Sequence, residues 1–232
     1  MKCVNFKTKN IIRGIIVFFL FFYSVYLQYI PVLLFKMDVH NISPVESVLL
    51  STFSSTIVLF ILFFIYRKDL IREFKIFKEN FIENIDIGFR YWMLGLFIMM
   101  ISNVIITYFL KGGGANNEVA VQKMIKTLPW LMVIDAGIIA PFNEEIVFRK
   151  TLKDIFNNPI ILCILSFLFF GGAHVIESAK TLIDWLYIIP YGSLGAAFAY
   201  AYYKTDTIFT SMSLHIFHNL VLCAMSIVLL FI

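Results

Sequence analysis

The sequence has little charge. Asp, Glu, Lys and Arg make up only 15% of its 232 residues, whereas about 25% is usual in water-soluble domains. Hydrophobic residues account for 60% of the chain, 26 of them phenylalanine, and the mean hydropathy is +0.87. This composition excludes an ordinary soluble globular domain. It predicts an integral membrane protein.

Several familiar catalytic and binding patterns are missing. The three cysteines, Cys3, Cys163 and Cys223, form no CxxC motif, so we interpret them as small apolar side chains and not as a disulfide or metal set. Gly-x-Ser-x-Gly and HExxH are also absent, which argues against a serine hydrolase and a zincin. The net charge of +4 is spread along the chain, so we expect no nucleic-acid partner.

The charged residues lie between apolar runs of about 20 residues, the length that a helix needs to cross a bilayer. A spanning segment must satisfy its own backbone hydrogen bonds, so we predict an all-α, polytopic transmembrane bundle of about seven spans, six at the least and eight at the most. The N-terminus resembles a signal peptide but lacks a small-residue cleavage site, and we expect it to be retained as the first span. The seven predicted spans are residues 12–35, 45–66, 88–109, 128–156, 159–176, 182–203 and 207–231.

Lys and Arg are distributed unevenly over the predicted loops. With the N-terminus inside, 14 of them lie in inner segments, and the outer five are Lys36, Lys111, Lys123, Lys126 and Lys180. The positive-inside rule therefore favours a cytoplasmic N-terminus and an outer C-terminus in a multi-pass cell-membrane protein.

Residues 67–86 carry Leu70, Phe74, Phe77 and Phe81 at helical spacing among charged residues. This pattern predicts a helix on the inner membrane surface. We therefore divide the single membrane domain into N-terminal spans, 1–110, which include this helix, and a core, 116–231, which carries the polar motifs described next.

Three polar insertions interrupt apolar segments of the core: APFNEEIVFRK at 140–150, FGGAH at 170–174 and HIFHN at 215–219. Ionisable groups are costly in a membrane and usually functional there. At 1.5 Å per residue, Glu144, His174, His215 and Asn219 lie about 12–22 Å from the inner ends of their spans. The sequence therefore predicts one shared polar centre in the membrane, open toward the cytoplasmic side.

The first insertion contains two carboxylates, of which one is expected to form an ion pair and the other to stay unpaired. Pro141 removes a backbone hydrogen bond, so we expect the helix to kink or restart there, with the glutamates in its first turn. Glu145 and Arg149 are four residues apart and can pair along one face. Glu144 points about 100° away and stays available to another helix.

The second and third insertions add three imidazoles and a carboxamide. His215 and Asn219 share one helix face, whereas His218 faces elsewhere and is assigned to packing. A carboxylate and a histidine can activate water while a second histidine and an amide stabilise an oxyanion. On spacing alone, His174, His215 and a glutamate can equally form a zinc site.

EEIVFR, FGGAH and HIFHN, in this order, resemble the three motifs of the CPBP family of intramembrane proteases. That family contains CAAX prenyl endopeptidases, bacteriocin-processing or immunity proteins and abortive-infection-like proteins. The resemblance covers residues 116–221 and departs from the family at Lys150, where many members have glycine.

The resemblance implies a glutamic-type endopeptidase that cleaves a peptide or a lipidated polypeptide near the cytoplasmic membrane face. It implies that Glu144 and His174 activate water, that His215 and Asn219 hold the oxyanion, and that Glu145 and Arg149 support the site. No cofactor is required in this mechanism; a metal-dependent version, with zinc for example, is the lesser one.

Two further hypotheses come from other functional classes. One is a non-catalytic bacteriocin immunity or peptide-binding membrane protein. The other is a small transporter with a carboxylate proton relay, which is disfavoured because no inverted repeat is visible. Composition favours a bacterial source. Membrane lipid is an expected partner, and oligomeric state and substrate identity stay open.

Overall fold

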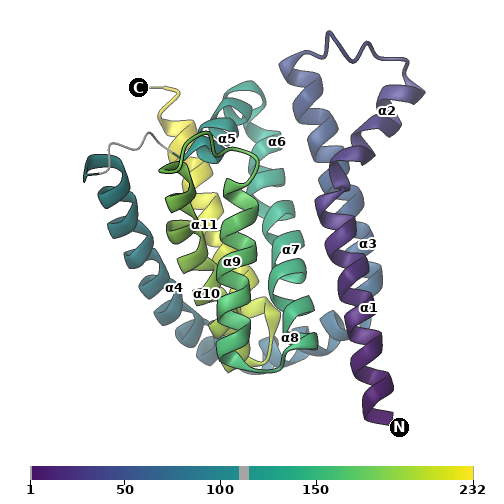
Figure 1. Cartoon of the computed structure of the whole chain (residues 1–232), viewed down its shortest axis with the longest axis vertical. Helices are drawn as coiled ribbons and strands as arrows, with labels where there is room; N and C mark the ends of the chain where they lie inside the picture. Colours follow the sequence, from purple (N-terminus) through teal and green to yellow (C-terminus); the bar gives the residue numbers. More distant parts are fainter. Residues whose placement is uncertain (1, 110–114, 232) are drawn as a thin grey trace.

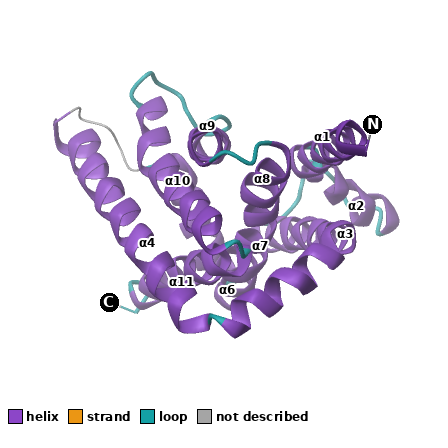
Figure 2. Ribbon diagram, turned by 90° about the horizontal axis from the view of Figure 1, so that it is seen from below, coloured by secondary structure: helices purple, strands orange, loops and turns teal. Residues whose placement is uncertain are grey.

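The computed structural model describes residues 2–109 and 115–231, and over these ranges it contains helices and loops without strands (Figures 1 and 2). The all-α prediction is confirmed. The helices are α1 (Lys2–Phe22), α2 (Tyr29–Leu34), α3 (Pro44–Glu79), α4 (Phe81–Val104), α5 (Asn116–Thr127), α6 (Pro129–Ile134), α7 (Ala140–Glu145), α8 (Thr151–Ile155), α9 (Pro159–Val175), α10 (Ile188–Thr205) and α11 (Ile208–Val228).

Each of the seven predicted spans lies mainly in helix, but not all of these helices meet the requirements for a span. Among the described residues, α3, the run Phe81–Phe109 and α11 are long and apolar enough to cross a membrane. A fourth span is obtained only if Thr8–Phe22 and Ser24–Leu34, which meet at 53°, count together. The first predicted span is therefore bent, and the total of seven stays a prediction.

Helix α3 is longer than the sequence pattern indicated. It starts at a capping box, in which Ser43 and Glu46 satisfy each other's backbone N–H groups, and it continues without a break to Glu79. Figure 2 shows its last turns passing beneath the bundle to α4. Residues 67–86 are helical, as predicted, but they are the end of α3 and the start of α4 and not a separate helix.

The end of α3 is fastened to the core by Glu73, which is buried. Its carboxylate accepts hydrogen bonds from the Ile208 N–H at the start of α11, at 2.9 Å, and from the Tyr202 hydroxyl, at 3.2 Å. It also lies 3.4 Å from the Lys150 ammonium. Because the first N–H groups of a helix have no partner within it, Glu73 satisfies one of those of α11 from another helix.

Lys150, at which the sequence departs from the family pattern, belongs to the same group of charged side chains as Glu73. It is buried and pairs with Asp154 at 2.6 Å. Arg13 of α1 contacts the same Asp154 and also Asp69 of α3. The lysine therefore links α8 to the N-terminal helices.

The chain from Pro129 to Ile155 stays helical and includes two π-helical turns, η3 (Asp135–Ile139) and η4 (Ile146–Lys150). Pro141 does not restart the helix: Ala140, directly before it, has helical angles, φ −61° and ψ −51°. The expected restart is wrong, because the helix continues from the π turn η3 through the proline into α7. The two glutamates therefore lie inside a continuous helix and not at a free N-terminus.

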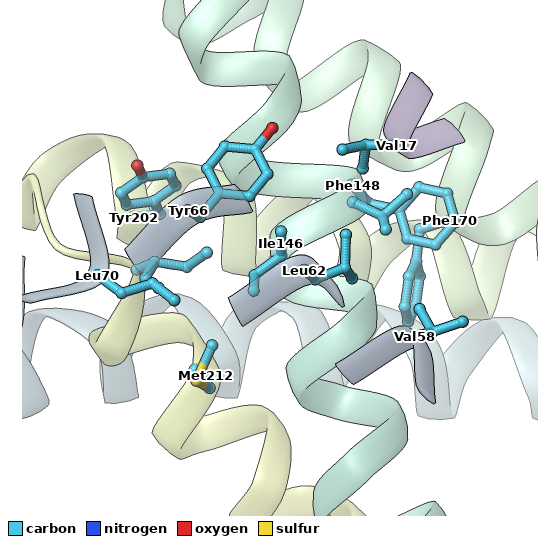
Figure 3. Packing of buried hydrophobic residues seen from close by; sticks show 12 residues of the cluster. Val17, Val58, Leu62, Tyr66, Leu70, Ile146, Phe148, Phe170, Tyr202 and Met212 are labelled. Carbon is cyan, nitrogen blue, oxygen red and sulfur yellow. The ribbon is translucent and has the colours of Figure 1, made fainter. Parts of the chain in front are cut away.

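Helix α10 packs along both α9 and α4, and small residues allow the close approach. A Cβ atom on Gly195 would lie 2.9 Å from the Ser166 carbonyl oxygen, and one on Gly95 would lie 2.7 Å from the Ala197 Cβ. Small residues thus form the packing face of α10. The largest apolar cluster lies between α1, α3, η4 and α11 (Figure 3), with Leu62 and Phe148 fully buried.

The adjacent glycines of FGGAH offer a matched test of this packing. A Cβ on Gly171 would lie 2.7 Å from the Ile188 carbonyl oxygen, whereas one on Gly172 would meet nothing within 4 Å. We expect Gly171→Ala to lose about 1–3 kcal/mol of stability through overpacking. Gly172→Ala should be neutral or slightly stabilising, because alanine favours helix. Thermal unfolding in detergent checks this, and equal melting temperatures for the two variants would contradict the packing.

Candidate active site

Glu144, His174, His215 and Asn219 line one cavity of about 290 Å³. They come from three helices: Glu144 from α7, His174 from the end of α9, and His215 and Asn219 from adjacent turns of α11. The cavity is lined mainly by apolar atoms and contains these few polar groups, as is usual for a ligand site. The structure therefore brings the predicted polar residues together.

His215 lies between the two glutamates. Its Nδ1 is 2.9 Å from Glu145 Oε1, and its Nε2 is 3.5 Å from Glu144 Oε2. Since an ionised carboxylate only accepts hydrogen bonds, Nδ1 carries a proton and donates a hydrogen bond to Glu145. The ring of Phe198 stacks on the imidazole, with 4.9 Å between centroids. The position of His215 is thus set by a hydrogen bond and a ring contact.

The predicted ion pair between Glu145 and Arg149 is present and has no exposed surface. Arg149 Nη1 is 3.3 Å from Glu145 Oε1. The guanidinium carbon also lies 4.2 Å from the centroid of Phe170 and 5.6 Å from that of Phe198. Aromatic faces attract a desolvated cation, so the phenylalanine of FGGAH helps to hold the arginine of EEIVFR.

His174 is oriented by its own helix. Its Nδ1 is 2.8 Å from the Phe170 carbonyl oxygen, which can only accept, so Nδ1 donates. In the neutral ring, Nε2 is then an acceptor. Tyr191 stacks on the imidazole, with centroids 4.6 Å apart. The Tyr191 side chain also lines the cavity.

The Asn219 side chain supplies a hydrogen-bond donor that the backbone lacks at Pro141. In the π register the Ala140 N–H donates to the Asp135 carbonyl, so the next carbonyl, that of Ala136, would need an N–H at Pro141, which has none. Asn219 Nδ2 donates to that carbonyl at 2.9 Å. One of its two amide hydrogens is used in this way, and the other is available.

Two polar residues near this centre carried no functional interpretation from the sequence. His218, assigned to packing, does pack against Trp92, with ring centroids 6.2 Å apart, and also lines the cavity. Asp135 is buried on η3, where it accepts a hydrogen bond from Thr52 at 3.2 Å. A carboxylate within the apolar stretch before Pro141 was the available signal for Asp135.

The zinc-site hypothesis requires that His174, His215 and a glutamate lie close enough to bind one metal ion. Within residues 2–109 and 115–231, no group of three or more His, Cys, Asp or Glu side chains is placed to hold a metal ion. The side chains as arranged do not fit a zinc site, which needs at least three protein ligands.

Comparison with known proteins agrees with these motifs. Residues 126–221 match the family described as type II CAAX prenyl endopeptidase Rce1-like. This segment therefore carries an Rce1-like domain, and the family identified from the three motifs is confirmed.

Two curated proteins are similar to the chain. "Putative membrane peptidase YdiL" of Bacillus subtilis (strain 168) is 28% identical over 145 residues, which are 59% of this chain and 56% of that protein. "UPF0177 protein YxdF" of Lactococcus lactis subsp. lactis (strain IL1403) is 24% identical over 150 residues, 62% of this chain and 81% of that protein. The chain thus spans little more than half of the Bacillus protein. No solved structure matches the chain.

The buried pair yields a stability prediction. Glu145→Gln leaves the Arg149 charge without its partner, which should cost about 3–5 kcal/mol. The double variant Glu145→Leu with Arg149→Met removes both charges and should recover much of this loss. Unfolding in detergent checks both. A double variant no more stable than the single one would show that the ion pair is not the source of the loss.

Proposed function

Because residues 126–221 carry an Rce1-like domain, we propose that this protein is an intramembrane endopeptidase of the glutamic type. One observation carries the proposal: Glu144, His174, His215 and Asn219, from three helices, line a single cavity. Nucleophilic serine and cysteine motifs are absent from the sequence, so water is the nucleophile. A peptide or a lipidated polypeptide is the substrate.

Glu144 and His174 activate the water. The Glu144 carboxylate faces the cavity, and among the residues that the structure describes its ion-pair partner is His215. The Nε2 atom of His174 is an acceptor, because Nδ1 donates to the Phe170 carbonyl. Two acceptors near one water orient it and remove its proton as it attacks the peptide carbonyl, which is general-base catalysis.

His215 and Asn219 stabilise the oxyanion of the tetrahedral intermediate. In the proposed step the His215 ring carries a proton on both nitrogens. Its Nε2–H then donates to the oxyanion, together with the second amide hydrogen of Asn219. Preorganised donors of this kind act strongly where water is excluded. Glu144 finally passes the proton from water to the leaving amine.

Each remaining side chain has a positioning role. Glu145 holds the orientation of the His215 ring through Nδ1, and Arg149 balances the charge of Glu145. Phe170 and Phe198 keep both groups in place through ring contacts. No step requires a metal.

Substitution of the proposed base is the direct test. Purified Glu144→Gln should lose about 10²–10⁴-fold in kcat/KM, because a glutamine cannot accept the proton from water. The probes are a farnesylated CAAX peptide, its unmodified counterpart and a random peptide library. Glu177→Gln, an exposed carboxylate after α9, is the matched control and should cleave as wild type. Cleavage by Glu144→Gln at the wild-type rate would refute the assignment.

A parallel experiment with a chelator distinguishes the metal-free mechanism from a metal-dependent one. Wild-type cleavage should persist after incubation with a chelator, since the proposed reaction uses water and side chains alone. Loss of cleavage, restored by added zinc, would replace this mechanism with a metal-dependent one.

The oxyanion role makes a separate prediction. Asn219→Ala should lower kcat about 10²–10³-fold and leave KM nearly unchanged, because the lost donor acts on the intermediate and not on the bound peptide. Steady-state kinetics on the cleaved peptide check this. An increase in KM with an unchanged kcat would instead make Asn219 a substrate-binding residue.

A further inference from the structure

The cavity reaches one end of the bundle. Besides the four polar residues, it is lined by Glu118 and Gln122 of α5, both exposed, and by Ser226 near the end of α11. Figure 1 shows α5 at the end where the chain's C-terminus lies, opposite the N-terminus. The exposed lining residues therefore indicate that the cavity opens toward the α5 end.

The opposite end is closed. Going from Glu144 toward α8, Ile146, Phe148 and Arg149 have no exposed surface, and neither does Phe198 from α10. Beyond them the side chains around Glu73 tie the end of α3 to α8 and α11. A peptide cannot pass through this layer without unpacking it.

The two ends also differ in their content of lysine and arginine. The α8 end includes the turns between α3 and α4, α8 and α9, and α10 and α11, with Lys68, Arg72, Lys75, Lys78, Lys153 and Lys204. At the α5 end the lysines of the described chain are Lys36, Lys123, Lys126 and Lys180. Acidic residues lie at both ends, among them Asp69, Glu79, Asp154 and Asp206 at the α8 end and Glu118 and Asp184 at the α5 end, and they contribute little to orientation. Lysine and arginine are enriched in short cytoplasmic loops, so the closed end is the cytoplasmic one.

We propose that the cavity receives its substrate from the extracytoplasmic side, through an entrance formed by α5, α4 and the end of α11. The inference rests on the proposed function for the identity of the substrate as a peptide. It replaces the expectation, drawn from the sequence, of a site open toward the cytoplasm. The amide and carboxylate groups of Asn117, Glu118 and Gln122 at the entrance suit a peptide backbone better than a hydrocarbon tail.

Thiol accessibility tests the direction without requiring activity. In a background with Cys3, Cys163 and Cys223 replaced, we would introduce Ala140→Cys inside the cavity and Lys204→Cys at the closed end. A small, charged, membrane-impermeant methanethiosulfonate is then applied to spheroplasts and to inverted vesicles. Ala140→Cys should react in spheroplasts and be protected in inverted vesicles, and Lys204→Cys should show the reverse. Labelling after denaturation confirms that each thiol is present.

Ser226→Cys, a nearly isosteric change farther along the cavity, replaces Ala140→Cys as the cavity probe if that variant does not fold. Reaction of the cavity cysteine only in inverted vesicles, or from neither side, would overturn the inference. The outcome is independent of catalysis: a protein that cleaves nothing but reacts from outside would contradict the proposed protease and leave the direction of access intact.

Discussion

The arrangement of the core depends on burying charge in an apolar bundle. Glu145 and Arg149 have no exposed surface, and an isolated charge in such surroundings is costly. Each therefore needs partners from neighbouring helices: His215 of α11 for the carboxylate, and the rings of Phe170 and Phe198 for the guanidinium. These contacts bring α7, α9, α10 and α11 together, and Glu144 faces the cavity as a result.

The backbone of the site imposes a second requirement. A buried carbonyl needs a donor, and the π turn before Pro141 leaves that of Ala136 without one. Asn219 supplies the donor, and at the second π turn Ser166 donates a hydrogen bond to the Phe148 carbonyl at 2.8 Å. π turns are frequent at functional sites. Here they connect the helix of the two glutamates to α9 and α11 through side-chain hydrogen bonds.

The N-terminal helices lie outside the region that matches the family, yet they contribute to the site's framework. Glu73 of α3 holds the start of α11, two turns before His215. Lys150 joins the same network through Glu73 and Asp154. This lysine is thus part of how the chain attaches its N-terminal segment to the core.

Composition and motif spacing alone determined that the protein is helical and membrane-embedded, which residues form the polar centre, and which family they resemble. These properties follow from local chemistry: the length of the apolar segments, the types of residue in the polar insertions, and the four-residue spacing of Glu145 and Arg149. Only the tertiary structure decided the course of the chain at Pro141, the placement of His215 between two glutamates, and the contact of Tyr191 with His174. It also decided which end of the cavity is closed. Such features depend on which helices approach one another, and that choice is made by long-range packing and partner groups far apart in the sequence.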